Sequence, residues 1–270
     1  MKNVFLILVF VNLFAFNFFG QESLISKADS LRNLGRSFYD KNPARFISLL
    51  DSAAILYTQL ENKKQQGYCL QNIAFAYEEK LDNVDSAISY IEKAIPIWID
   101  IQESFNQANL LKYLGMLQGK KGKYTKGKEN IWKAIALFEN NNFEAGIAVS
   151  YFDLALLYDN ASQLDSSIYY FEKNKAYFES KQDTSRIFGV NTKLFETYLK
   201  EENYKAASEM YESNLNMEKS SRVHWQNLID YYKISMKYFK LVDNSELYEF
   251  NQENYKRLCE KLSQQGIIIK

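Results

Sequence analysis

The sequence predicts an all-α fold in which about six antiparallel helix pairs stack in chain order as an α-solenoid. The first observation is a ten-residue block that recurs at intervals of 41, 40, 40 and 40 residues, because a fixed period in this range is typical of stacked repeats. The second is composition, since two prolines, ten glycines and 16% aromatic residues in 270 residues favour long helices joined by short turns. The blocks begin at Ser48, Ser89, Glu129, Tyr169 and Glu209.

A second apolar segment precedes each block, so every unit of the repeat contains two segments. In both segments, apolar residues recur at spacings of three and four, which is the pattern of amphipathic helices. Each unit is therefore predicted to be a helical hairpin. The first helices are centred near Gly35, Ala74, Gly115, Ala155 and Phe195.

The repeat resembles the tetratricopeptide repeat (TPR) family, in the variant of about 40 residues found in bacterial and kinesin-light-chain-like arrays. In that family a small residue in the middle of the first helix lets the partner helix approach, and Phe195 departs from this pattern. The matching residues are Gly35, Ala74, Gly115, Ala155 and Ser235. An aromatic residue follows three positions later, as Phe38, Tyr77, Tyr158, Tyr198 and Tyr238, with Gln118 as the exception.

The second helix carries a further family position, which is occupied by alanine early in the chain. Ala53, Ala94 and Ala134 match it, whereas Asn174 and Asn214 replace the alanine in later units. Small residues at such positions allow two helices to cross closely, and the aromatic residues beside them supply buried area.

The resemblance extends over residues 24–263 and implies a right-handed solenoid whose first helices line a concave face. We predict one solenoid domain over residues 21–263 and a short tail over 264–270. The sixth unit is atypical because Asn251 stands where a bulky residue is expected. Its last helix is rich in Asn, Gln, Glu and Lys, which suits a terminal cap whose outer face meets water.

Residues 1–20 differ from the rest of the chain and resemble a secretory signal peptide. Lys2 precedes an apolar run over residues 4–16 that is interrupted only by Asn12, and cleavage is expected between Gly20 and Gln21. An uncleaved membrane anchor is the alternative, although the run is shorter than the ~20 residues that span a bilayer. We expect an exported protein, periplasmic or secreted, of a Gram-negative envelope, with no membrane span in the mature chain.

Export would place two cysteines in an oxidising compartment, where an even number normally suggests a disulfide. Cys69 belongs to the second unit and Cys259 to the sixth. Stacking would separate them by far more than the about 7 Å between Cα atoms that a disulfide allows. We expect two unpaired cysteines, packed in the interior as small apolar groups.

Local signals also predict where the second helices begin and where one is interrupted. The expected N-caps are Asn42, Asp85, Asp165 and Ser245. Pro96 falls inside the second helix of the second unit, where the loss of one backbone hydrogen bond predicts a kink or an early end.

No pattern supports catalysis, so the sequence predicts a non-enzymatic protein without a cofactor or metal site. His224 is the only histidine, expected on the surface at a helix start, and no P-loop, G-x-S-x-G or H-E-x-x-H motif occurs. An enzyme would gain support only from a pocket joining His224 to a Cys or Ser. Lysines gather between Lys120 and Lys128, which we interpret as an exposed turn, with attraction of an acidic partner as the alternative.

The charges balance, with 33 basic and 33 acidic residues, which argues against nucleic acid as a partner. We expect a protein or peptide ligand instead, held along a concave groove by inward-facing positions of the first helices. They mix aromatic, Met and isolated charged side chains, which suits an adaptable peptide site. These positions are Arg32, Arg36, Tyr68, Gln71, Phe75, Asn109, Lys112, Met116, Phe152, Leu156, Thr192, Glu196, Tyr232 and Met236.

Two functions fit these observations. The leading hypothesis is a non-enzymatic, exported TPR scaffold for protein–protein or protein–peptide interaction. The alternative is the periplasmic sensory ectodomain of a membrane-bound regulator, of the histidine kinase or DNA-binding type, whose remainder lies beyond Lys270. A reading frame that continues past Lys270 into an apolar span would favour the alternative, whereas a stop codon would favour the scaffold.

Overall fold

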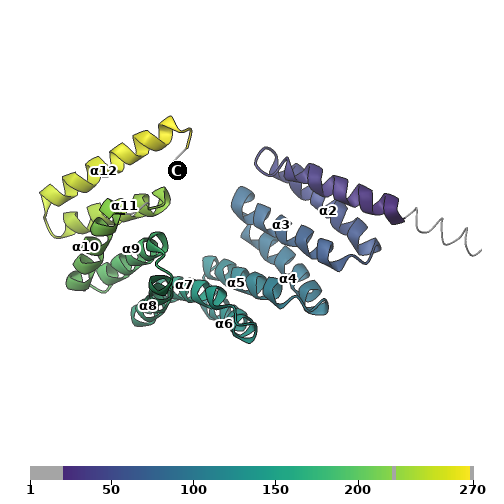
Figure 1. Ribbon diagram of the computed structural model, residues 1–270, viewed down its shortest axis with the longest axis horizontal. Coiled ribbons are helices and arrows are strands. Elements are labelled where there is room, and N and C mark those ends of the chain that lie inside the picture. The colour runs from purple at the N-terminus through teal and green to yellow at the C-terminus, as the bar shows by residue number, and fades with distance from the viewer. Residues whose placement is uncertain (1–20, 221–222, 268–270) are drawn as a thin grey trace, which may run out of the picture. The chain divides into compact units, whose positions relative to one another are not determined.

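The computed structural model describes residues 21–220 and 223–267, and all regular structure within these ranges is helical (Figure 1). Residues 21–36 form the first helix. The others are α2 (Pro43–Gln59), α3 (Lys63–Leu81), α4 (Val84–Asp100), α5 (Ser104–Lys120), α6 (Tyr124–Asn140), α7 (Glu144–Asn160), α8 (Leu164–Ser180), α9 (Thr184–Lys200), α10 (Tyr204–Ser220), α11 (Trp225–Leu241) and α12 (Ser245–Gln264). The predicted signal peptide and the last three residues of the predicted tail lie outside the described residues.

The helices form two units, which divide between Phe143 and Glu144, and within each unit most helices pack against their neighbours in sequence. In the N-terminal unit, the helix over residues 21–36 shares a core with α2, and α2 to α6 pack in chain order. In the C-terminal unit, α7 packs on α8, α8 on α9, α9 on α10, and α11 on both α9 and α12. Each unit thus contains three successive helix pairs. The predicted all-α fold of helical hairpins is confirmed.

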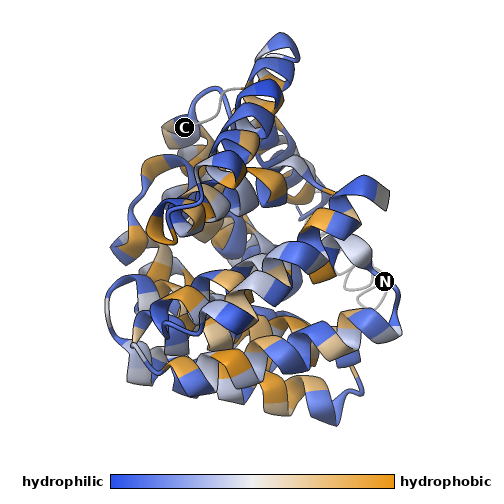
Figure 2. Ribbon diagram, turned by 90° about the vertical axis from the view of Figure 1, so that its left-hand side faces the viewer, coloured by the Kyte–Doolittle hydropathy of each residue, from blue (hydrophilic) through white to orange (hydrophobic). Residues whose placement is uncertain are grey.

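Amphipathic character differs between the helices: α4 and α9 each carry a distinct apolar face, whereas apolar residues are spread around α5 and α7. Figure 2 shows hydrophobic and hydrophilic residues mixed along the helices. None of the helices in the described ranges combines the length and the apolar content needed to cross a membrane.

Small residues bring the two helices of a pair together. Gly115 on α5 is the clearest case, because a Cβ atom there would lie 2.6 Å from the carbonyl oxygen of Gly127 and 2.7 Å from Cγ1 of Ile131 on α6. Gly67 on α3 faces the fully buried indole of Trp98 in the same way. Backbone and large side chains therefore occupy the space that a β-carbon would need.

Polar contacts link neighbouring repeats at close to the repeat interval. Tyr90 donates a hydrogen bond of 2.8 Å to Asp51, and the Lys64 ammonium lies 2.7 Å from the Glu103 carboxylate. Burial, and next the hydrogen bond to Asp51, raise the pKa of the Tyr90 hydroxyl, so it remains a donor at neutral pH. Exposed ion pairs add little stability. These contacts therefore specify how repeats align more than they hold the fold together.

Three of the four predicted N-caps are wrong. Asp85, Asp165 and Ser245 lie one or two positions inside their helices, while Asn42 caps α2 as predicted. Acidic side chains in a first turn still stabilise a helix through its dipole, which explains why Asp85 and Asp165 stand so close to the true starts. The residues at the N-cap positions are Asn83, Gln163 and Asn244.

The early end predicted at Pro96 does not occur, since α4 continues to Asp100. Pro96 and Glu92, whose carbonyl would have accepted the missing hydrogen bond, are both exposed, so water can take the donor's place. Ala94 and Trp98 on either side of the proline are fully buried. Their packing holds the helix through the interruption.

Both cysteines are unpaired, as predicted. Cys69 is fully buried, and burial raises the pKa of its thiol to about 11. Cys259 is only half-buried, so its predicted place in the interior is wrong, because among the described helices α12 packs mainly on α11. His224 is exposed at the N-cap of α11, where its Nδ1 accepts a 3.4 Å hydrogen bond from the backbone N–H of Gln226. Its predicted position is confirmed.

The C-terminal unit places asparagine where the N-terminal unit has alanine. Asn174 is 1% exposed and donates a 2.7 Å hydrogen bond to the carbonyl of Ala148 on α7. Asn214 is fully buried and donates at 3.1 Å to the carbonyl of Phe188 on α9. A buried amide is tolerated when it is hydrogen-bonded. The two amides therefore tie each second helix to its partner.

Asn251 also belongs to the interior. It is fully buried, and its amide donates hydrogen bonds of 3.2 Å to the Tyr211 hydroxyl and 2.7 Å to the carbonyl of Leu247. The polar composition of α12 therefore describes its outer side, where Glu249 and Lys256 are exposed. The bulky residue expected at position 251 is replaced by a polar contact with α10.

We predict that Gly115→Ala lowers the free energy of unfolding of the N-terminal unit by about 1–3 kcal/mol, because the new β-carbon collides with backbone. Alanine would otherwise favour a helix by about 1 kcal/mol. Denaturant titration followed by circular dichroism measures the change. Gly189→Ala is the matched control, since its β-carbon meets only the amide end of Asn227 at 3.3 Å. Equal stability changes in the two variants would contradict the close-packing argument.

Candidate functional site

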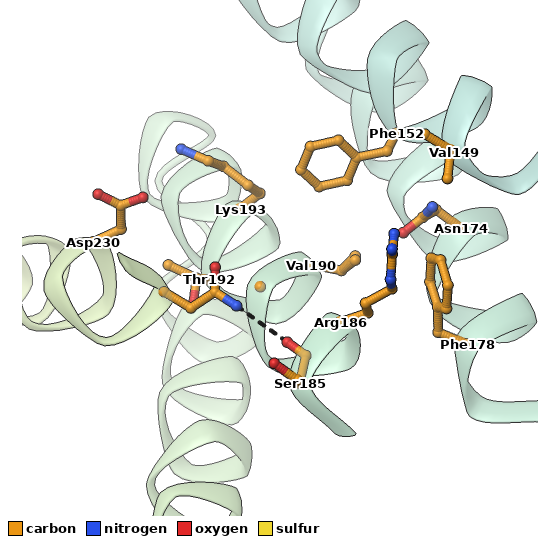
Figure 3. Close-up of a pocket in the computed structure, with 12 residues that line it drawn as sticks. Val149, Phe152, Asn174, Phe178, Ser185, Arg186, Val190, Thr192, Lys193 and Asp230 are labelled. Atoms are coloured by element: carbon orange, nitrogen blue, oxygen red, sulfur yellow. Dashed lines mark hydrogen bonds between the residues drawn. The ribbon is translucent and has the colours of Figure 1, made fainter. Parts of the chain in front are cut away.

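A cavity of about 320 Å³ opens between α7, α8, α9 and α11 of the C-terminal unit (Figure 3). One side is apolar, formed by Val149 and Phe152 from α7, Phe178 from α8 and Val190 from α9. Figure 3 shows the Phe152 ring projecting into this space. The volume lies at the small end of the range for ligand sites, about 300–1,000 Å³. The cavity is therefore suited to a side chain or short segment rather than a folded domain.

Asn174 supplies a buried polar group to this cavity. Its Nδ2 is used by the hydrogen bond to the Ala148 carbonyl, but its buried Oδ1 has no hydrogen-bond partner in the described part of the chain. An unsatisfied buried acceptor costs about 1–3 kcal/mol.

Charged groups lie around the cavity on α9 and α11. The Arg186 guanidinium lies 4.9 Å from the centroid of the Phe178 ring and 3.5 Å from the Asp183 carboxylate. Lys193 lies two turns further along α9, within 3.2 Å of the Glu196 carboxylate. Asp230 contributes the negative charge from α11. Figure 3 shows Lys193 and Asp230 on the opposite side from Phe178 and Asn174.

Gly189, which has no side chain, lines part of the cavity. Gly189 on α9 faces Asn227 on α11, whose Nδ2 donates a 3.2 Å hydrogen bond to the Ser185 carbonyl. This bond fixes α11 beside the start of α9. A side chain larger than alanine at position 189 would extend into the space between these two helices.

Two of the predicted groove residues, Phe152 and Thr192, line this cavity. Thr192 is 2% exposed and donates to a backbone carbonyl of its own helix, so its role is structural. Tyr232 is likewise buried and donates a hydrogen bond to Glu218, away from any open surface. Leu156, Glu196 and Met236 are half-buried.

Some predicted groove residues of the N-terminal unit pack between helices, and others are partly exposed at the surface. Tyr68 packs edge-on against Trp98 with ring centroids 4.9 Å apart, and Phe75 packs edge-on against Tyr113 at the same distance. These aromatic side chains therefore fill the core between helices. Arg36 is exposed. The remaining predicted groove residues of this unit are half-buried: Arg32, Gln71, Asn109, Lys112 and Met116.

Residues of the cavity that sequence reasoning missed fall into two groups. Asn174 and Phe178 lie on a second helix, whereas the groove was sought on first helices alone. Arg186 and Asp230 lie on first helices, but outside the positions counted from the central small residue. The replacement of alanine by asparagine at position 174 was the signal that could have located the site.

The lysine cluster and His224, which the sequence also singles out, make structural contacts within the chain. Two lysines of the basic cluster form ion pairs with the preceding repeat, Lys120 with Glu78 and Lys121 with Asp85 at 2.6 Å. His224 accepts a capping hydrogen bond. Over residues 21–220 and 223–267, no group of three or more His, Cys, Asp or Glu side chains is placed to hold a metal ion.

Solved structures share this architecture. Nearly identical TPR-like repeats of a protein described as a kinesin light chain, from Podosopora anserina, match with a TM-score of 0.60 and 15% identity, covering 72% of this chain and 95% of that one. A STAND signal transduction ATPase with a TPR sensor, from Pyrococcus horikoshii, matches with a TM-score of 0.72 and 14% identity, covering 90% and 38%. A Rap protein complexed with competence and sporulation factor matches with a TM-score of 0.59 and 18% identity, covering 89% and 66%.

These similarities confirm the predicted resemblance to TPR proteins as a resemblance of fold. The chain spans less than two fifths of the length of the ATPase and about two thirds of the Rap protein. No family model and no curated protein matches the sequence.

We predict that Asn174→Leu leaves the free energy of unfolding of the C-terminal unit unchanged or raises it, by up to about 2 kcal/mol, because it removes an unsatisfied acceptor at the expense of one hydrogen bond. Asn214→Leu is the control, since it also removes an unsatisfied acceptor, Asn214 Oδ1, but loses two hydrogen bonds, to the Phe188 carbonyl and the Thr192 hydroxyl. Urea titrations should rank Asn174→Leu above Asn214→Leu. The reverse ranking would show that the number of lost hydrogen bonds does not decide the stability change.

Proposed function

We propose that the protein is a non-enzymatic, exported scaffold that binds a segment of a protein or peptide at the cavity of its C-terminal unit. The observation that carries the proposal is this cavity between α7, α8, α9 and α11, because it joins apolar walls to charged side chains. Sites of this composition bind ligands through apolar burial and a few placed polar contacts.

The helical framework suits this role. The walls belong to helices that are held by buried residues on their other sides, including Ala155, Leu194 and Phe171. A rigid site loses little conformational entropy when a ligand binds. The structurally similar Rap protein was solved with competence and sporulation factor bound, which supports a ligand-binding role for this kind of fold.

Export forms the second part of the proposal. The apolar run near the N-terminus supports a signal peptide. Two unpaired cysteines are compatible with an oxidising compartment, because a buried thiol such as Cys69, with a pKa of about 11, is almost entirely protonated and so reacts slowly.

Photo-crosslinking in the native envelope tests the binding face. A benzophenone side chain placed at Phe152 should form adducts with the ligand, because this ring projects into the cavity. The same group at Ala176, an exposed position on the outer side of α8, is the matched control. Adducts are identified by mass spectrometry after illumination.

The crosslinks should depend on the open cavity. Gly189→Leu would fill the space beside Asn227 and reduce the adducts at position 152 by about tenfold, while leucine remains a good helix former. Equal yields from positions 152 and 176, or yields that are insensitive to Gly189→Leu, would refute the binding face.

A sensory role is the second candidate, favoured by the similarity to the TPR sensor of the STAND ATPase, of which this chain covers 38%. In this proposal the helix pairs are the ligand-sensing part of a longer signalling protein. Sequencing of the gene beyond the Lys270 codon tests it. Continuation into an apolar span followed by a signalling domain would support the sensor, and an immediate stop codon would exclude it.

A further inference from the structure

The charges around the cavity carry information about its ligand, provided that the proposed binding face is correct. Positive charge comes from α9 and negative charge from α11, so the two signs stand on different helices. A purely apolar ligand would offer no partner to either the positive or the negative side chains. The arrangement therefore favours a ligand with one group of each sign.

Arg186 is the cation best placed to receive an acidic group. Its guanidinium lies over the Phe178 ring, which orients it beside the apolar wall. Its ion pair with Asp183 is 3.5 Å long, and the two side chains are 58% and 40% exposed. A pair of this kind contributes little, so a ligand carboxylate can replace it. Lys193 is less available because its ion pair with Glu196 is shorter, at 3.2 Å, and both side chains are less exposed than those of Arg186 and Asp183.

Asp230 is the corresponding site for a basic group. It is exposed and stands one helical turn beyond Asn227, which is hydrogen-bonded to α9 at Ser185. Arg186 lies on the other side of this contact, towards α8. Neighbouring helices lie about 8–10 Å apart and one turn rises about 5.4 Å, which separates the two charges by roughly 10–15 Å.

This separation matches an extended peptide. An extended chain advances about 3.3–3.6 Å per residue, so charged side chains three residues apart stand roughly 10 Å apart at the backbone. Between them, one apolar side chain would enter the space that Phe152, Phe178 and Val190 surround.

We infer that the cavity binds an internal, extended segment of a protein partner that carries an acidic and a basic side chain three residues apart, with an apolar residue between them. The acidic group pairs with Arg186 and the basic group with Asp230. The chain ends of the partner take no part, because both charges of the ligand come from side chains.

Three end-blocked peptides test this inference against the full chain. They are acetyl-Ala-Glu-Phe-Leu-Lys-Ala-amide and its variants with two Glu or two Lys at the charged positions. Calorimetric titration should show that the unmodified protein prefers the Glu/Lys peptide by about tenfold over each variant. Asp230→Lys should transfer the preference to the Glu/Glu peptide, and Arg186→Glu to the Lys/Lys peptide.

These substitutions suit the test because both side chains are exposed, so the fold should survive them. Circular dichroism checks this. Equal binding of all three peptides, or no change of preference in the two variants, would overturn the charge assignment while leaving the binding face intact. Binding of unblocked peptides alone would overturn it in favour of recognition of chain ends. Absence of peptide binding together with specific crosslinks at position 152 would overturn it as well, whereas loss of those crosslinks would refute the binding face itself.

Discussion

The close approach of two helices at a small residue is the constraint on which this structure depends. Gly115 leaves no room for a β-carbon against the backbone of α6, and Ala74 and Ala155 are fully buried at the equivalent positions. Once two helices approach this closely, large side chains beside the contact bury most of their surface, as Trp98 does. Burial of apolar area at about 25 cal/mol per Å² then supplies most of the stabilisation. Because the repeat has a period of about 40 residues, this packing arrangement recurs along the chain.

The C-terminal unit has the same close helix packing, but with residue changes that create the candidate binding site. Asparagine replaces alanine at positions 174 and 214, so helix pairs there are joined by hydrogen bonds as well as by apolar packing. At both positions the amide oxygen has no hydrogen-bond partner among the described residues, and Asn174 also lines a cavity. Groups that lower the stability of the unbound protein are common at binding sites, because the ligand compensates them.

The sequence predicts the fold well because the fold depends on local and periodic features. Helix periodicity, the small residues at Gly35 and Gly115 and the position of His224 at a helix start can all be read from nearby residues. The N-caps were predicted less well, since Asp85 and Asn83 are both suitable and only the backbone geometry decides between them. Asn251 shows the same limit, because a polar residue on a terminal helix can face either water or a buried tyrosine.

The candidate site could be predicted only in part. Phe152, a predicted groove residue, lines the cavity, but the cavity also requires Asn174 and Phe178 from a second helix. Their convergence depends on the angle and spacing between helix pairs, which no repeat position specifies. The placement of the charged groups around the cavity also depends on the angle and spacing between helix pairs, because Arg186 and Asp230 belong to different repeats.

The central claim is that each helix is stabilised by its neighbours in sequence. Circular dichroism of a fragment ending at Phe143, which contains the three helix pairs of the N-terminal unit, tests this claim most directly. The account predicts a helical fragment that unfolds cooperatively in urea, because the contacts of these helices lie within the fragment. A fragment without helical structure would contradict it, since stability would then depend on contacts distant in the sequence.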